Sequence, residues 1–154
     1  METVIIAPHP DDEIIGCYKY LTQTNPIIIY DGDTDVERRV ETQNLRNHAD
    51  IKVQLFLMAI PPNLLNKDTI FYFPDPIYEN HPLHRKWGAI GEQYAREGHN
   101  VLFYNTNMNA PYIYEVDNSK AKEALLNTIY PSQSDLWKYE KKYVLFEGYN
   151  QWLF

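Results

Sequence analysis

Four polar or charged side chains follow directly on a run of strand-forming residues near the N-terminus. The segment reads VIIAPHPDDEIIGC, and it places His9, Asp11, Asp12 and Glu13 behind residues 4–7. Burying such groups costs free energy unless a partner compensates them. Histidine and carboxylate side chains are common metal ligands. His9 and Asp12 stand three positions apart across a turn, so they can converge on one ion while Asp11 between them faces the open side.

A second histidine pair lies in the segment HPLH, which contains His81 and His84. A catalytic zinc site has three protein ligands and one water, so this pair can complete a site begun by His9 and Asp12. Zinc lowers the pKa of its bound water to about 7, and a nearby carboxylate can take the proton as that water attacks a carbonyl. The two motifs together predict a metal-dependent hydrolase.

Each motif also has a plain structural interpretation. The residues PDDE are a good helix start, because proline suits the beginning of a helix and carboxylates accept hydrogen bonds from its first N–H groups. His81 and His84 on their own are ordinary loop residues. The metal interpretation is favoured because both motifs follow predicted strands.

The surrounding pattern alternates strands with helices. We predict strands at residues 4–7, 26–30, 52–57, 69–73 and 100–104 and a short strand at 112–114, with helices beginning near Asp11 and at 36–49, 87–97 and 119–130. Such alternation is typical of a parallel sheet with helical crossovers. We therefore expect an α/β fold, a Rossmann-like three-layer sandwich with a mostly parallel sheet, in a single domain over residues 1–154. Ligands of such sheets bind at the carboxyl ends of the strands, where we place the metal site.

The composition and net charge of the chain limit the kinds of molecule that the protein could bind. The chain has 154 residues, a net charge of −7 and a pI near 5.1, which argues against nonspecific binding to nucleic acid and favours a small, mostly neutral ligand. Its one cysteine, Cys17, rules out an intramolecular disulfide. The sequence contains neither a signal-peptide pattern nor the roughly 18 apolar residues of a membrane span. We expect a cytoplasmic protein, and the sequence indicates no particular oligomeric state.

The same motifs carry a resemblance to a known family. APHPDDEIIGC resembles the signature of the PIG-L/LmbE-like deacetylases, which are zinc-dependent and act mostly on N-acetylglucosaminyl groups. YDGD, RRVETQNLRNHADI, HPLHRKWGAIGEQ and SKAKEALLNTIYPSQ resemble later segments of that family in the same order. The chain looks like a short member, with the missing length between LFLM and FYFPD.

The resemblance implies a role for each site residue. His9, Asp12 and His84 would bind zinc, for which Fe²⁺ or Co²⁺ could substitute. Asp11 would be the general base, and His81 would stabilise the oxyanion and help to protonate the leaving amine. Arg38 would contact the sugar or its attached group. The reaction would be removal of an acetyl group from an N-acetylated amino sugar.

Two departures from the family pattern leave alternatives open. Leu83 stands where the family usually has an aspartate, so Asp75 or Glu79 would have to orient His81. The missing middle segment leaves the substrate open, so the same chemistry on a sugar attached to a nucleotide, lipid, cofactor or modified nucleic-acid base is an alternative. Another is a trimmed, inactive member that binds a sugar or a partner without hydrolysis.

Three further acidic residues lie close to these motifs. We expect Glu13 to cap its helix or to pair with one of the two arginines at positions 38 and 39. Asp31 and Asp33 follow the second predicted strand, where they serve either turn chemistry or a substrate hydroxyl.

Overall fold

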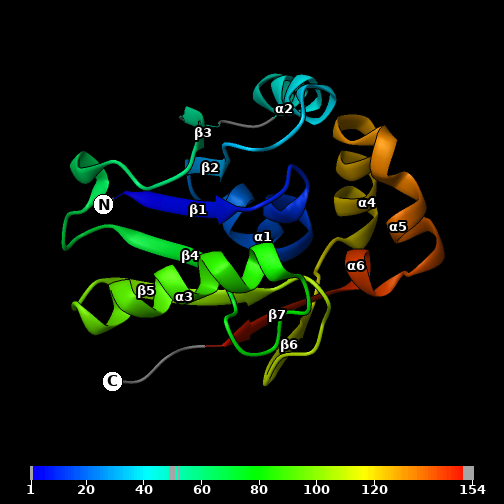
Figure 1. The fold of residues 1–154 in the computed structure, drawn as a ribbon. Coiled ribbons are helices and arrows are strands. Elements are labelled where there is room, and N and C mark those ends of the chain that lie inside the picture. Colours follow the sequence, from blue (N-terminus) through cyan, green and yellow to red (C-terminus); the bar gives the residue numbers. More distant parts are fainter. Residues whose placement is uncertain (1, 49–50, 52, 151–154) are drawn as a thin grey trace.

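The fold is built on a seven-stranded sheet with the strand order β3-β2-β1-β4-β5-β7-β6 (Figure 1). The computed structural model describes residues 2–48, 51 and 53–150. The strands are β1 (Thr3–Ala7), β2 (Ile27–Asp31), β3 (Val53–Leu57), β4 (Ile70–Pro74), β5 (Asn100–Asn105), β6 (Tyr112–Glu115) and β7 (Phe146–Asn150). The first five strands pair in parallel, and β7 runs antiparallel to both β5 and β6. The expected α/β fold with a mostly parallel sheet is confirmed.

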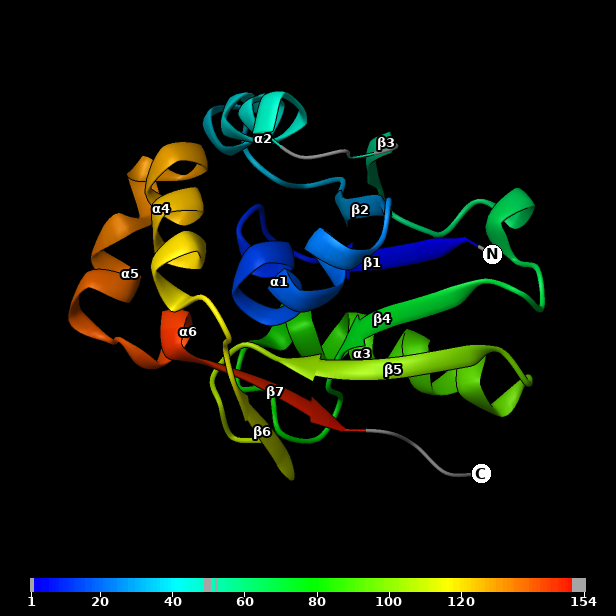
Figure 2. The same ribbon diagram turned by 180° about the vertical axis from the view of Figure 1, so that it is seen from behind.

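Helices lie on both faces of this sheet (Figures 1 and 2). They are α1 (Asp12–Gln23), α2 (Val36–His48), α3 (Pro82–Arg96), α4 (Ser119–Ile129), α5 (Ser134–Tyr139) and α6 (Lys142–Leu145), with 3₁₀ turns η1 (Pro62–Leu64) and η2 (Pro131–Gln133). Helix α3 packs against β4 and β5 on one face, while α1, α4 and α6 lie together on the other.

Strand β1 shows why the sheet is buried on both sides. Its alternate residues belong to two different hydrophobic clusters, because successive side chains of a strand point to opposite faces. Ile5 and Ala7 pack with the residues of α1 and α4, whereas Val4 and Ile6 pack with Trp87 of α3. The continuous run of apolar residues in the sequence reflects this two-sided burial.

Helix α3 begins earlier than the sequence pattern predicts. We expected it to start at Trp87 with HPLH in a loop, but it starts at Pro82 and includes His84. His81 is its N-cap, and the ring Nδ1 accepts a hydrogen bond of 3.1 Å from the backbone N–H of Leu83. Proline at the first helical position has no N–H to leave unsatisfied, which favours this start.

The observed ends of the other predicted helices and strands differ from the predicted ends by fewer residues. The predicted ends at Ala49 and Lys52 lie outside the described residues. Strand β7 was not expected, because its sequence FEGYN lacks the β-branched residues that mark strands.

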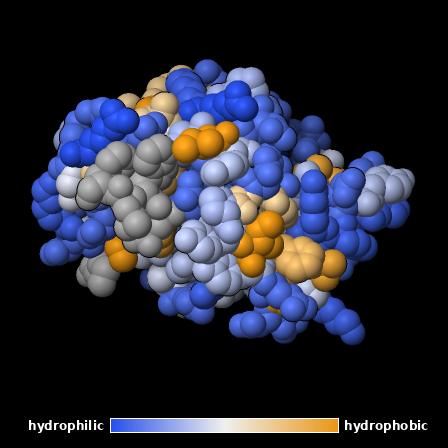
Figure 3. All heavy atoms as spheres, turned by 90° about the horizontal axis from the view of Figure 1, so that it is seen from below, coloured by the Kyte–Doolittle hydropathy of each residue, from blue (hydrophilic) through white to orange (hydrophobic). Residues whose placement is uncertain are grey.

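One face of the molecule mixes apolar and polar side chains (Figure 3). On the face shown in Figure 3, apolar side chains appear in small groups among polar ones. None of the described helices combines the length and apolar composition that a membrane crossing requires.

Candidate metal centre

The two histidine motifs meet where the strand order of the sheet reverses. Strands β1 and β4 are neighbours, but their following connections lead to opposite faces of the sheet, to α1 and to α3. His9 follows β1, and His81 and His84 follow β4 at the start of α3. In α/β sheets such a switch point, at the carboxyl ends of the strands, is where ligands bind.

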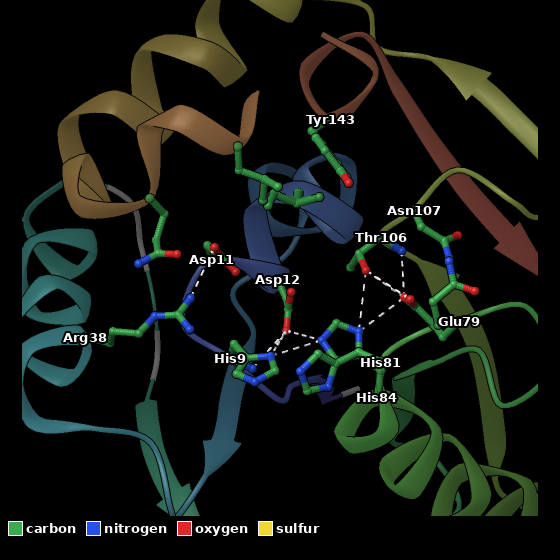
Figure 4. A pocket seen from close by; sticks show the side chains of 14 residues that line it. His9, Asp11, Asp12, Arg38, Glu79, His81, His84, Thr106, Asn107 and Tyr143 are labelled. Atoms are coloured by element: carbon green, nitrogen blue, oxygen red, sulfur yellow. Dashed lines mark hydrogen bonds and ion pairs between the residues drawn. The ribbon is translucent and has the colours of Figure 1, made fainter. Parts of the chain in front are cut away.

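Three imidazoles lie together at this point. His9, His81 and His84 each offer one ring nitrogen, and the three nitrogens lie within 4.8 Å of one another (Figure 4). The ring centroids of His9 and His81 are 4.6 Å apart, and those of His81 and His84 are 5.2 Å apart. A cluster of this kind could hold a metal ion.

Asp12 makes a tighter triplet with two of these histidines. Its Oδ2 lies 3.0 Å from Nε2 of His84 and 3.5 Å from Nδ1 of His9, and the two nitrogens are 3.1 Å apart. Ligands held tetrahedrally at about 2.1 Å from zinc are about 3.4 Å from one another. The structure therefore brings the three ligands expected from the sequence to within the spacing of a single coordination shell.

The backbone and the charges fix the position of this carboxylate. The same Oδ2 of Asp12 accepts a 2.8 Å hydrogen bond from the backbone N–H of His9. Burial alone would raise the pKa of Asp12, but His84 and His9 hold that pKa well below its usual range. Asp12 is thus kept as an anion, the form that binds a cation.

A second carboxylate supports His84 from behind. Nδ1 of His84 lies 3.3 Å from Oε1 of Glu79, which also accepts hydrogen bonds from the backbone N–H and the hydroxyl of Thr106 at 2.7 and 2.8 Å. Burial opposes the charged imidazole, yet Asp12 and Glu79 together raise the pKa of His84 to about 10. Metal-bound histidines are commonly held by a carboxylate in this way, so that the other ring nitrogen faces the ion.

We expected Glu79 or Asp75 to orient the ring of His81, but both carboxylates bind other groups. Glu79 contacts His84, and Oδ1 of Asp75 accepts from two backbone N–H groups of its own loop. Instead, the N–H of Leu83 holds the ring of His81 through Nδ1. Because Nδ1 accepts, the neutral ring carries its proton on Nε2.

Asp11 and Arg38 form the other side of the site. An Nη2 nitrogen of Arg38 lies 3.2 Å from Oδ2 of Asp11 and also donates to the carbonyl of Pro10. Asp11 is only 4% exposed, and its φ of 124° is a backbone conformation that residues other than glycine rarely adopt. Burial and the charge of Asp12 raise the pKa of Asp11 well above its usual range, and Arg38 offsets this only in part.

Glu13 stabilises the strained turn at Asp11 through hydrogen bonds. Its Oε2 accepts a 3.1 Å hydrogen bond from the backbone N–H of Asp11, and its Oε1 accepts from the hydroxyls of Tyr30, at 3.0 Å, and Tyr130. Burial raises the pKa of Glu13 to about 7, although the Tyr130 hydroxyl favours the charged form. Glu13 thus joins β2 and the end of α4 to the turn, rather than pairing with an arginine of α2.

Asp31 is occupied by structural contacts. Its two oxygens accept from the backbone N–H of Asp33 at 2.9 Å and from the indole N–H of Trp87 at 2.8 Å. Turn chemistry, together with a contact to α3, therefore accounts for both oxygens of this carboxylate.

A pocket of about 390 Å³ opens over the histidines and Asp11. Part of its wall comes from the C-terminal third of the chain, through Gln133, Leu136 and Tyr143. Asn107 and Asn80 line it from the loops after β5 and β4. The sequence pattern did not indicate these wall residues, because no spacing relation connects them to the motifs.

The described part of the chain is thus an α/β domain whose histidine cluster could hold a metal ion beside a buried aspartate. No protein-family model matches this chain, and neither a curated protein nor a solved structure does.

Proposed function

We propose that the protein is a metal-dependent amidohydrolase that removes an acetyl group from an N-acetylated amino sugar. The observation that carries this proposal is the triplet of donor atoms on His9, Asp12 and His84, separated by 3.0 to 3.5 Å, with the carboxylate of Asp11 beside it. Its sequence resemblance to the PIG-L/LmbE-like deacetylases and its Rossmann-like strand order support the same assignment.

The donor set fits a zinc ion. Two imidazole nitrogens and one carboxylate oxygen form a usual ligand set for catalytic zinc, and Glu79 supplies the carboxylate that such sites place behind a histidine ligand. Fe²⁺ and Co²⁺ accept the same set of donors. When bound, the cation would acidify a water ligand to a pKa of about 7 and polarise the amide carbonyl.

The protein side chains supply the proton transfers. Asp11, held by Arg38, accepts a proton from the attacking water and so acts as the general base. His81, with its proton on Nε2, donates a hydrogen bond to the carbonyl oxygen as this atom gains negative charge. The proton held by Asp11 then passes to the nitrogen of the departing amine, while His81 keeps its proton on Nε2.

A binding protein without catalysis is the rival. Asp11 argues against it, because a pure binder has no need of a buried carboxylate beside its metal ligands. Burying an anion there costs free energy, and an arginine is used to offset that cost.

The deciding experiment is release of free amine from N-acetylglucosamine and its methyl glycoside by the zinc-loaded protein. We expect release that stops when a chelator is added and resumes when Zn²⁺, Co²⁺ or Fe²⁺ is restored. A protein that holds one metal ion per chain and releases no amine from any N-acetyl sugar would be a binder, and the proposal would be wrong.

A further inference from the structure

The residues that line the pocket around the proposed metal ligands indicate which substrate the site accepts. We infer that the substrate is a compact, uncharged N-acyl amino sugar, and not a phosphate-bearing conjugate, with Asn107 and Gln133 binding its hydroxyl groups. This inference rests on the proposed function, since it identifies which amide the site would hydrolyse.

The size of the pocket favours a small substrate. Its volume of about 390 Å³ lies near the lower end of the range of about 300–1,000 Å³ that is typical of small-molecule sites. Leu136 and Tyr143 add apolar surface to the pocket lining, which suits the face of one sugar ring. Figure 4 shows Tyr143 on the side away from the histidines.

Amide groups supply neutral polar contacts around the rim. The side chain of Asn107 is fixed in place, because its Nδ2 donates to the carbonyl of Tyr78 at 3.1 Å and its Oδ1 accepts from the N–H of Asn109 at 3.0 Å. A primary amide has two hydrogens and two lone pairs, so one donor and one acceptor remain for a ligand. A fixed group that can both donate and accept is well suited to a sugar hydroxyl, which does the same.

Apart from the proposed metal ion and its histidine ligands, the lining of this pocket offers little positive charge for a phosphate. Among the described residues that line it, Arg38 is the one arginine, and there is no lysine. Arg38 is held by Asp11 at 3.2 Å and by the carbonyl of Pro10. Phosphate sites in proteins commonly use arginine forks or free lysines.

Negative charge lies on the other side of the same arginine. A smaller pocket of about 220 Å³ shares His9 and Arg38 with the main one and is lined by Asp31, Asp33 and Asp35. A phosphate group extending past Arg38 would meet the exposed carboxylates of Asp33 and Asp35, and like charges at such range repel. The net charge of −7 acts in the same direction.

The test compares one sugar with and without phosphate. Amine release is measured from methyl N-acetylglucosaminide, N-acetylglucosamine 1-phosphate and a uridine-diphosphate conjugate, at low and high salt. We expect kcat/KM for the two phosphorylated compounds to be at least about tenfold lower at low salt, with a smaller difference at high salt as charges are screened. Equal or faster turnover of a phosphorylated compound would overturn the inference.

A charge-introducing variant sharpens the comparison. Gln133→Lys places a cation in the wall, and we expect the ratio of kcat/KM for phosphorylated over neutral sugar to rise about fivefold to tenfold. Gln93→Lys, at an exposed position of α3 outside the pocket lining, changes the net charge equally and should leave the ratio unchanged. The inference fails if both variants change the ratio alike.

A binding measurement distinguishes a failure of this inference from a failure of the proposed function. Calorimetric titration of the chelator-treated wild-type protein with the same three compounds needs no turnover. Preferential binding of the neutral glycoside without amine release by the loaded protein would refute the hydrolase and retain the inference. Preferential binding of a phosphorylated compound, or no binding of the neutral glycoside, would refute the inference.

Discussion

Oδ2 of Asp12 lies 3.0 Å from Nε2 of His84, although the two residues come from opposite halves of the chain. Asp12 begins α1, and His84 lies in the first turn of α3 on the other face of the sheet. Only the parallel pairing of β1 with β4 brings these two helix starts together. The fold therefore creates this contact, and the contact is the basis of the proposed metal site.

Removal of His84 should release the metal. We expect His84→Ala to lose bound zinc, since the site keeps only two ligands and leaves Asp12 and Glu79 without their shared partner. His81→Ala is the matched control, because it changes the other histidine of the same motif and should retain zinc at about one ion per chain. Elemental analysis of both purified proteins provides the measurement. Full zinc content in His84→Ala, or its loss in His81→Ala alone, would contradict the ligand assignment.

Removal of Asp11, the proposed general base, should greatly reduce turnover without loss of the metal. Asp11→Asn is expected to keep zinc and to reduce kcat by about 10²–10⁴-fold, the usual contribution of general acid–base catalysis. Metal analysis and amine release on the same preparation show both effects. Wild-type turnover by this variant would mean that another group accepts the proton.

The tyrosine pair on Glu13 should contribute to stability. Tyr130→Phe removes one hydroxyl donor from the buried Oε1 of Glu13, and we expect the free energy of unfolding to fall by about 1–3 kcal/mol. Denaturant unfolding measures this change. Tyr139→Phe, at a position that is 76% exposed, is the control and should leave stability within about 0.5 kcal/mol of wild type. A fall of similar size in the control would argue against the hydrogen bond as the cause.

A buried ion pair behind α1 offers a separate test of the fold. Nζ of Lys122 lies 3.5 Å from Oε1 of Glu147 and donates to the carbonyl of Ile15 at 2.7 Å, with the lysine fully buried. Lys122→Met should cost about 3–5 kcal/mol, because it leaves a buried carboxylate without its cation. The double variant Lys122→Met, Glu147→Gln removes both charges and should recover most of that loss in denaturant unfolding. No recovery would mean that the charge pair is not the cause.

The pH dependence of this pair has a definite sign. Burial lowers the pKa of Lys122 from 10.5 to about 8, with Glu147 opposing the shift. Between these values the unfolded chain binds more protons than the folded one, so stability rises with pH in this window. Relative to the double variant, the wild type should gain up to about 3 kcal/mol between pH 8 and 10.5. A relative loss over that window would contradict the burial of a charged lysine.

The sequence predicted most clearly those strands whose side chains are buried on both faces of the sheet. The apolar runs before His9 and at residues 26–30 predicted buried strands, and both predictions are confirmed. The meeting of the two histidine motifs followed from the rule that ligands collect at the carboxyl ends of parallel strands.

Most contacts that complete the site depend on tertiary structure. His81 acts as an N-cap although histidine is not a usual cap, so Pro82 at the first helical position was the one local signal for the early start of α3. The partners of Glu13 come from β2 and from the end of α4, far apart in the chain. Gln133 and Tyr143 reach the pocket through the packing of short C-terminal helices, which no periodicity encodes.

The most direct test of the central claim is anomalous diffraction from a crystal of the zinc-loaded protein. We predict one peak per chain, within about 2.0–2.2 Å of Nδ1 of His9, Oδ2 of Asp12 and Nε2 of His84. A crystal grown with saturating zinc that shows no peak at this point, or a peak ligated by the three histidines without Asp12, would contradict the account.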